Sequence, residues 1–126
     1  MTENNFEARL LTPDDYKGFA TVYNDFRNRA VEEYKFELEP LGFDDFVDSV
    51  DKKLIDCLVL YENTIPVAFL VYTTAISEAV ELNIIHSFKM ENIAERSVYL
   101  IKKFLELTKA ERTEKIVSVS YTHLRA

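Results

Sequence analysis

Glycine is scarce in this chain, and its absence from the last two thirds limits the turns that the backbone can make. The 126 residues contain two glycines, Gly18 and Gly42, and none follows position 42. Walker and Rossmann loops hold phosphates with backbone N–H groups that turn toward the anion in conformations that a Cβ obstructs. The sequence therefore excludes both of these phosphate-binding motifs.

Length and charge indicate one acidic, foldable domain. A chain of 126 residues leaves no room for a second core of ordinary size. Hydrophobic residues make up 48% of the chain, which is ample for a packed interior. The net charge is −7, and no run of Lys or Arg exceeds two residues, so the sequence has no electrostatic footprint for nucleic acid. We therefore expect no nucleic-acid partner.

Several features argue against a membrane protein, a secreted protein and a metal site. The longest apolar runs, 57–61 and 67–72, are far shorter than the roughly 20 residues that span a bilayer. The first residues, MTENN, lack the basic start and apolar core of a signal peptide. Cys57 heads an apolar run, which favours core packing over a nucleophile, and only His86 and His123 could join it on zinc. We expect a cytoplasmic chain without a membrane or metal partner.

Hydrophobic periodicity predicts a mixed α/β (α+β) domain with the order β-α-α-β-β-β-α-β. Apolar residues recur every three or four positions in the helical stretches, and they alternate or run together in the strands. The helix between the last two strands favours parallel pairing of those strands. The predicted strands span 6–11, 56–62, 65–74, 80–86 and 116–119, and the predicted helices span 13–34, 43–54 and 93–110.

Two surfaces within this order carry candidate functional residues. The first helix has an aromatic stripe that either packs on the sheet or lines a ligand groove with Tyr23, Phe26 and Tyr34. Alternation along the fourth strand predicts two faces, each with a polar group. One face carries Val80, Leu82, Ile84 and His86, and the other carries Glu81, Asn83 and Ile85.

The last eight residues, VSYTHLRA, resemble the translation of a transposase sequencing adapter. This resemblance implies that residues 119–126 are a non-native tail and that 1–118 form a single domain lacking its C-terminal end. We therefore keep 119–126 out of the functional argument.

The predicted order and several short sequences resemble the GNAT superfamily of acyl-CoA-dependent N-acyltransferases. Residues 9–15, RLLTPDD, look like the opening strand and helix start of the family. Residues 58–62 and 65–69 look like its second and third strands, with Ala68 where glycine is usual. The resemblance extends from Phe6 to about Ser118. It implies a GNAT-like mixed sheet with its last strands missing, and N-acetyltransferase activity that moves an acyl group from acetyl-CoA to an amine.

The same resemblance implies a cofactor site between the fourth strand and the third helix. In the family, a glycine-containing loop holds the pyrophosphate of acyl-CoA at the N-terminus of this helix. The spacing of Leu100 and Phe104 puts residues 92–97 on this loop, with Glu95 and Ser97 where the glycines belong. These departures count against ordinary pyrophosphate binding. The residues implied to contact the cofactor are Ile84, Ile85, His86, Lys89, Asn92, Arg96 and Ser97.

Two residues are candidates for the catalytic base. Glu81 matches the strand glutamate that often serves the family as base, and His86 titrates in the useful pH range. The alternatives are a solvent-facing carboxylate and a histidine that caps the sheet. The resemblance implies a small-molecule or peptide amine as acceptor and leaves a homodimer open. A GNAT-derived non-catalytic binding or regulatory module, with a degenerate CoA loop, and an unrelated α/β interaction domain remain the other hypotheses.

Overall fold

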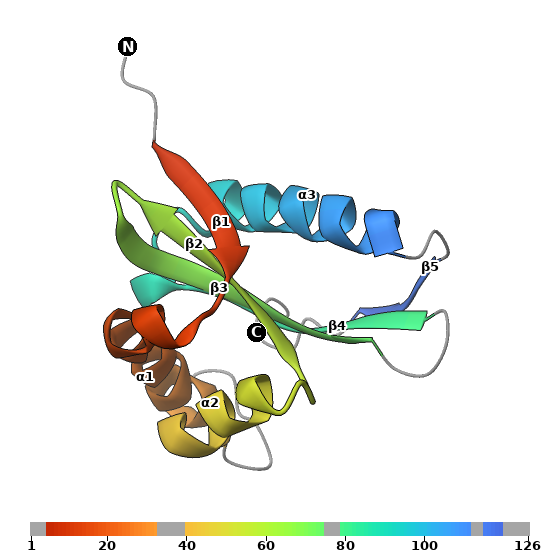
Figure 1. Cartoon of the computed structure of the whole chain (residues 1–126). Helices are drawn as coiled ribbons and strands as arrows, with labels where there is room; N and C mark the ends of the chain where they lie inside the picture. Colours follow the sequence, from red (N-terminus) through yellow and green to blue (C-terminus); the bar gives the residue numbers. More distant parts are fainter. Residues whose placement is uncertain (1–4, 33–39, 75–78, 112–114, 120–126) are drawn as a thin grey trace.

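The computed structural model describes residues 5–32, 40–74, 79–111 and 115–119 (Figure 1). Its elements follow the predicted order. The strands are β1 (Phe6–Leu10), β2 (Asp56–Glu62), β3 (Ile65–Thr74), β4 (Ala79–Ser87) and β5 (Lys115–Val119). The helices are α1 (Tyr16–Glu32), α2 (Phe43–Asp51) and α3 (Ile93–Glu111), and short 3-10 turns lie at Pro13–Asp15 and Phe88–Met90.

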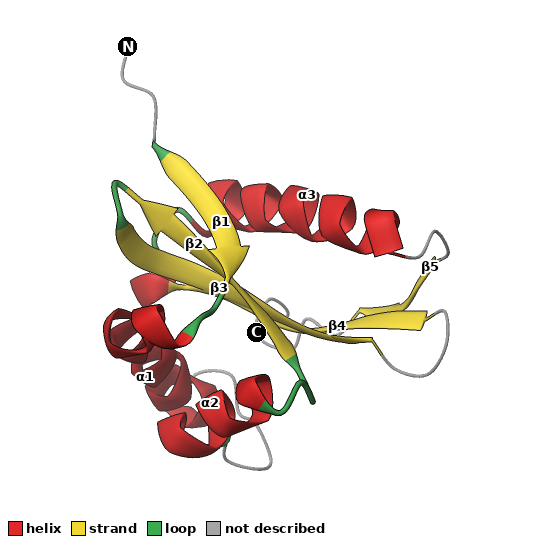
Figure 2. Cartoon of the chain, in the orientation of Figure 1, coloured by secondary structure: helices red, strands yellow, loops and turns green. Residues whose placement is uncertain are grey.

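One sheet with the strand order β1-β2-β3-β4-β5 forms the middle layer of the molecule. The first four strands are antiparallel, and β5 pairs with β4 in parallel, as the sequence predicts. Helix α3 lies above the sheet in Figure 2, and α1 and α2 lie below it. The mixed sheet is therefore covered on both faces.

Two hydrophobic cores lie on the two faces of the sheet. The core under α1 and α2 is rich in aromatic side chains, with Phe69 of β3 stacked edge-on against Phe19 and Phe26 of α1. Tyr23 is also buried, and its hydroxyl donates a hydrogen bond to the carbonyl of Leu41. The core-packing interpretation of the aromatic stripe is thus confirmed for Tyr23 and Phe26, whereas Tyr34 lies outside the described residues. The core under α3 is mainly aliphatic.

Cys57 is buried at the start of β2, which confirms its expected role in the core. Burial, together with the neighbouring carboxylate of Asp56, raises the pKa of the Cys57 thiol. The thiol therefore stays protonated at neutral pH and is a poor nucleophile.

The predicted division of β4 into two faces is wrong because the strand contains a bulge. Val71 of β3 pairs with Ile84 and Tyr72 pairs with Leu82, so Asn83 is an extra residue. An extra residue reverses the alternation of the side chains that follow it. Leu82 accordingly packs in the α3 core, whereas Ile84 packs against the α1 core.

The described backbone makes left-handed turns without using glycine. Neither glycine has a positive φ, whereas six other residues do. Asn63 and Thr64 join β2 to β3 with positive φ at both positions, as a type I′ hairpin turn requires. Lys53 follows α2. The remaining three residues, Lys89, Met90 and Asn92, lie in the loop between β4 and α3.

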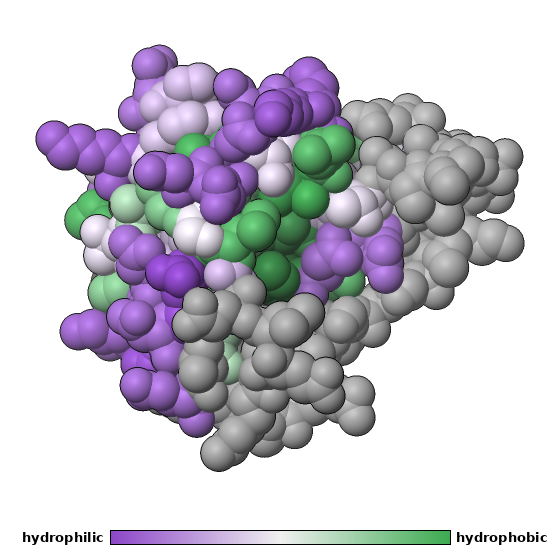
Figure 3. Space-filling view, turned by 90° about the horizontal axis from the view of Figure 1, so that it is seen from below, coloured by the Kyte–Doolittle hydropathy of each residue, from purple (hydrophilic) through white to green (hydrophobic). Residues whose placement is uncertain are grey.

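The described part of the face seen from below is hydrophilic at its margins and hydrophobic near its centre (Figure 3). Among the described residues, no helix combines the length and the apolar character needed to cross a membrane.

Candidate functional site

The loop between β4 and α3 holds its shape in left-handed conformations that L-residues seldom adopt. The φ angles are 54° at Lys89, 60° at Met90 and 46° at Asn92. Such a conformation costs an ordinary residue about 1–2 kcal/mol, and asparagine tolerates it best. The loop therefore requires contacts that hold Lys89 and Met90 in place.

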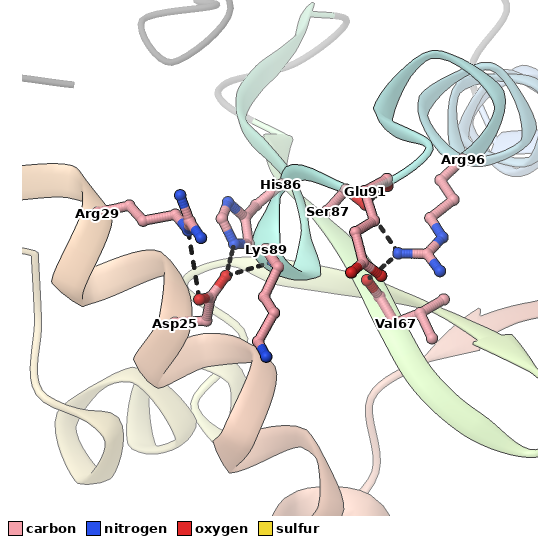
Figure 4. A network of polar contacts seen from close by, with 8 residues as sticks. All are labelled: Asp25, Arg29, Val67, His86, Ser87, Lys89, Glu91 and Arg96. Carbon is pink, nitrogen blue, oxygen red and sulfur yellow. Dashed lines mark hydrogen bonds and ion pairs between the residues drawn. The ribbon is translucent and has the colours of Figure 1, made fainter. Parts of the chain in front are cut away.

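The carboxylate of Asp25 on α1 binds the start of this loop (Figure 4). Its Oδ2 atom accepts a hydrogen bond from the backbone N–H of Lys89 at 2.8 Å and another from Nε2 of His86 at 2.8 Å. Its Oδ1 atom accepts a hydrogen bond from Nε of Arg29, one helical turn along α1, at 3.3 Å. One side chain thus joins α1, the end of β4 and the first left-handed residue.

Burial by itself would raise the pKa of Asp25, but its donors outweigh this effect. The N–H of Lys89, the side chain of His86 and the charge of Arg29 together lower the pKa of the Asp25 carboxyl. The carboxylate is therefore charged at neutral pH and acts as an acceptor. Consequently Nε2 of His86, whose side chain is fully buried, carries the hydrogen in this contact.

A second polar cluster holds the other side of the loop from the α3 face. The guanidinium of Arg96 donates from Nη1 to Oγ of Ser87 at 3.0 Å and from Nη2 to Oε1 of Glu62 at 3.3 Å. The hydroxyl of Ser87 donates to the carbonyl of Glu91. Arg96 is buried, and its guanidinium stabilises the loop through these hydrogen bonds within the protein.

Helix α3 begins directly after the last left-handed residue. The N–H of Arg96 donates to the carbonyl of Asn92, which is the first hydrogen bond of the helix. The N–H groups of Ile93 and Ala94 precede this bond in the first turn and point toward the N-terminal end of the helix. Together with the helix dipole they give this end of α3 a partial positive charge that favours an anion.

The last part of β4 leads to the loop. β4 pairs with β5 from Ala79 to Leu82, which faces Val119, the last described residue of β5, and residues 84–87 pair with β3. The backbone of Ile84 and Ile85 therefore lies on the strand segment that runs to the N-terminus of α3.

The predicted cofactor loop overlaps the start of α3. We expected the loop at 92–97; in the structure α3 starts at Ile93, and Phe88–Asn92 form the turn that precedes it. Glu95 and Ser97 consequently lie within the helix, where glycine is not required. The predicted cofactor residues Ile84, Ile85, Lys89 and Asn92 do lie together along the end of β4 and the loop.

Glu81 and His86 do not meet. Both lie on the α1 face of β4. They are five positions apart along an extended strand, which corresponds to a separation of roughly 15 Å. Glu81 is half-buried opposite Thr73, whereas His86 is buried beside Phe26 and Phe69.

Asp25, Ser87 and Glu62 are not among the site residues predicted from the sequence. Asp25 and Arg29 form an i,i+4 pair beside the apolar stripe of α1, which is visible in the sequence. The tertiary partners of the pair are not visible there, because they lie more than sixty positions away.

A separate cavity of about 240 Å³ lies between the start of β2 and the end of α2. Its polar lining includes Tyr16, Asp51 and Asp56. Because β2 and β4 run in the same direction, this cavity lies at the opposite end of the sheet from the loop.

Comparison with solved structures identifies the fold. No protein-family model and no curated protein sequence matches the chain. It is similar to a ribosomal-protein-alanine N-acetyltransferase from Brucella melitensis biovar Abortus 2308, with a TM-score of 0.67 and 12% identity over 92% of this chain and 78% of that one.

Two further structures are similar in the same way. A predicted acetyltransferase from Clostridium acetobutylicum, solved with acetyl-CoA, has a TM-score of 0.64 and 11% identity over 91% of this chain and 80% of that one. A GNAT-family acetyltransferase from Staphylococcus aureus Mu50 has a TM-score of 0.63 and 7% identity over 84% and 68%. The chain therefore has the GNAT fold, as the sequence predicts.

Replacing Asp25 by asparagine tests the charge of this site through the pH dependence of stability. The folded pKa of Asp25 is lowered, so its contribution to stability is present above the unfolded value of about 3.9 and is lost as pH falls through the folded pKa. We expect Asp25→Asn to lower the free energy of unfolding by about 1–3 kcal/mol near neutral pH. The difference from the wild type should shrink as pH falls below about 4.

Urea unfolding at several pH values between about 7 and 3 measures this difference. The exposed Asp48 of α2, paired with Lys52, provides a matched control, and Asp48→Asn should change stability by less than about 1 kcal/mol. An Asp25→Asn effect that is independent of pH would contradict the charged carboxylate.

Proposed function

We propose that this chain is an N-acetyltransferase domain that binds acyl-CoA at the β4–α3 loop and transfers the acyl group to an amine. The observation that carries the proposal is the left-handed turn at Lys89–Asn92, which delivers the chain to the N-terminus of α3. It lies at the end of β4, which pairs with β3 up to Ser87. The GNAT fold, and the similarity to a structure solved with acetyl-CoA, support the same assignment.

The residues present fit a pyrophosphate group. The N–H groups at the start of α3 supply donors without any glycine, and the exposed Lys89 supplies a positive charge beside them. The exposed Glu95 in the first turn opposes an anion, and its charge is one cost of this site. We assign Lys89 and Asn92 to the phosphates and the backbone of Ile84 and Ile85 to the pantetheine arm, and Ser97 stays a prediction.

His86 and Arg96 take a different part in this proposal from the one implied by the resemblance. Both side chains are buried and hydrogen-bonded within the protein. We therefore assign them to holding the loop in shape rather than to direct contact with the cofactor. Glu81 remains our candidate for the base, since it is half-buried and lies on the strand that approaches the reacting end of the site.

The reaction requires a base near the acceptor. When bound, acyl-CoA supplies a thioester whose carbonyl carbon is attacked by the amine nitrogen, so that an amide C–N bond forms, the C–S bond breaks and the CoA thiol is released. Glu81 would accept the proton that the amine loses, and a proton from solvent would convert the departing thiolate to the thiol. The net charge of −7 favours a cationic amine over an anionic acceptor.

Binding of acetyl-CoA should stabilise the folded chain. A ligand that binds the native state at about one hundred times its dissociation constant stabilises it by about 2.7 kcal/mol. We expect the melting temperature to rise by several degrees at about 1 mM acetyl-CoA. Pantetheine, which lacks the pyrophosphate, should give a much smaller shift. The absence of any shift with acetyl-CoA would count against the proposed function.

Substitution of Glu81 tests the proposed base. General base catalysis contributes about 10²–10⁴-fold to a rate. We therefore expect Glu81→Gln to lower kcat for acetyl transfer by this factor while the dissociation constant of acetyl-CoA stays within about threefold. Release of the CoA thiol with a panel of primary amines measures kcat, and titration calorimetry measures binding.

The exposed Glu106 of α3 provides the matched control, since Glu106→Gln removes the same charge on the other side of the sheet. Full activity of Glu81→Gln would remove Glu81 from the mechanism. Cofactor binding by the wild type without transfer to any amine of the panel would point instead to the non-catalytic module.

A further inference from the structure

We propose that Asp25 is a positioning residue that holds the glycine-free β4–α3 loop in its left-handed shape. Other loops adopt positive φ angles by using glycine. In this loop the carboxylate of Asp25 stabilises the positive φ angles that the Cβ atoms of the loop residues oppose. The consequence for acyl-CoA binding rests on the proposed function. The effect on the loop itself does not.

The loop needs such a device because of its sequence. Lys89 and Met90 both have a positive φ. Both also carry a Cβ, which opposes this conformation, whereas glycine, which has no Cβ, adopts it readily. The left-handed conformation costs each of these residues about 1–2 kcal/mol of free energy. A loop with this cost returns to ordinary backbone angles unless surrounding contacts outweigh it.

Asp25 contacts the backbone of the loop at a residue with a positive φ, rather than a side chain of the loop. Its Oδ2 atom accepts a hydrogen bond from the backbone N–H of Lys89 at 2.8 Å. The same oxygen accepts Nε2 of His86, the third residue before Lys89, so the strand end and the turn share one acceptor. Two donors on one charged oxygen fix the spacing between β4 and the turn.

The position of the carboxylate is set by the hydrophobic core. Phe26, the next residue of α1, is fully buried, and its ring lies 5.6 Å from that of Phe69 on β3. Arg29 holds the second carboxylate oxygen at 3.3 Å and so restricts its rotation. The side chain of Asp25 is about 15% exposed, which leaves water little access to compete with these bonds. The carboxylate is thus preorganised by the packing of α1 on the sheet.

The left-handed backbone provides a sharp test, because glycine should make Asp25 less necessary. In Asp25→Ala the loop loses its acceptor. Adding Lys89→Gly to this variant removes the Cβ that opposes a positive φ, whereas adding Lys89→Ala removes the lysine charge but keeps the Cβ. Glycine at position 89 should therefore restore the loop and alanine should not.

Amide hydrogen exchange at Glu91 measures the loop without using the contact that is removed, because this N–H donates to the carbonyl of Phe88 at 3.1 Å. We expect Asp25→Ala to speed its exchange by about tenfold or more. Asp25→Ala/Lys89→Gly should recover most of the protection, and Asp25→Ala/Lys89→Ala little of it. The N–H of Phe46 in α2 should be unaffected, and Asp48→Ala should leave Glu91 unchanged. If Asp25→Ala fails to fold, Asp25→Asn, which keeps one acceptor oxygen, should show a smaller increase of the same kind.

Titration of acetyl-CoA into the same variants separates the two proposals. We expect Asp25→Ala to weaken binding by about tenfold and Lys89→Gly to restore part of the loss relative to Lys89→Ala. Unchanged exchange at Glu91 in both Asp25 variants, or equal rescue by glycine and alanine, overturns the role of Asp25. Faster exchange with glycine-specific rescue, in a chain whose wild type binds no acetyl-CoA, supports the role of Asp25 and overturns the proposed function.

Discussion

The hydrogen bond from the N–H of Lys89 to the carboxylate of Asp25 connects the main parts of this structure. It joins α1, which is fixed to the sheet by its aromatic stripe, to the turn that begins α3. The same carboxylate oxygen also accepts a hydrogen bond from Nε2 of His86 at the end of β4. The orientation of the start of α3 relative to the end of β4 therefore depends on one half-buried carboxylate and on the packing that holds it.

This dependence gives the glycine content a structural meaning. A chain that has no glycine after position 42 still forms left-handed turns at Asn63–Thr64 and at Lys89–Asn92. In the hairpin, the turn is supported by the strands on both sides. In the β4–α3 loop the support comes from side chains, with Asp25 on one face of the sheet and the cluster of Arg96, Ser87 and Glu62 on the other. The loop can thus keep its left-handed turn in a sequence without the glycine motif.

Much of the fold could be predicted from the sequence, because hydrophobic periodicity reports local structure and burial. The order of elements, the parallel pairing of β4 with β5 and the packing of Tyr23 and Phe26 follow from it. The bulge at Asn83 does not, since an inserted residue reverses the faces of a strand without changing its composition. The arrangement of the candidate site could be predicted only in part. Lys89 and Asn92, both predicted from the sequence as site residues, lie in the loop. Asp25 was not predicted, because its role arises from a contact between residues 64 positions apart.

Chemical-shift mapping of the isotopically labelled chain during a titration with acetyl-CoA tests the central claim most directly. The account predicts that the largest changes occur at the backbone amides of Lys89, Asn92 and the first turn of α3, with smaller changes at Ile84 and Ile85. Changes confined to other surfaces, such as the cavity beside Tyr16 and Asp56, or no changes at saturating cofactor, would contradict the claim that the glycine-free loop holds the cofactor.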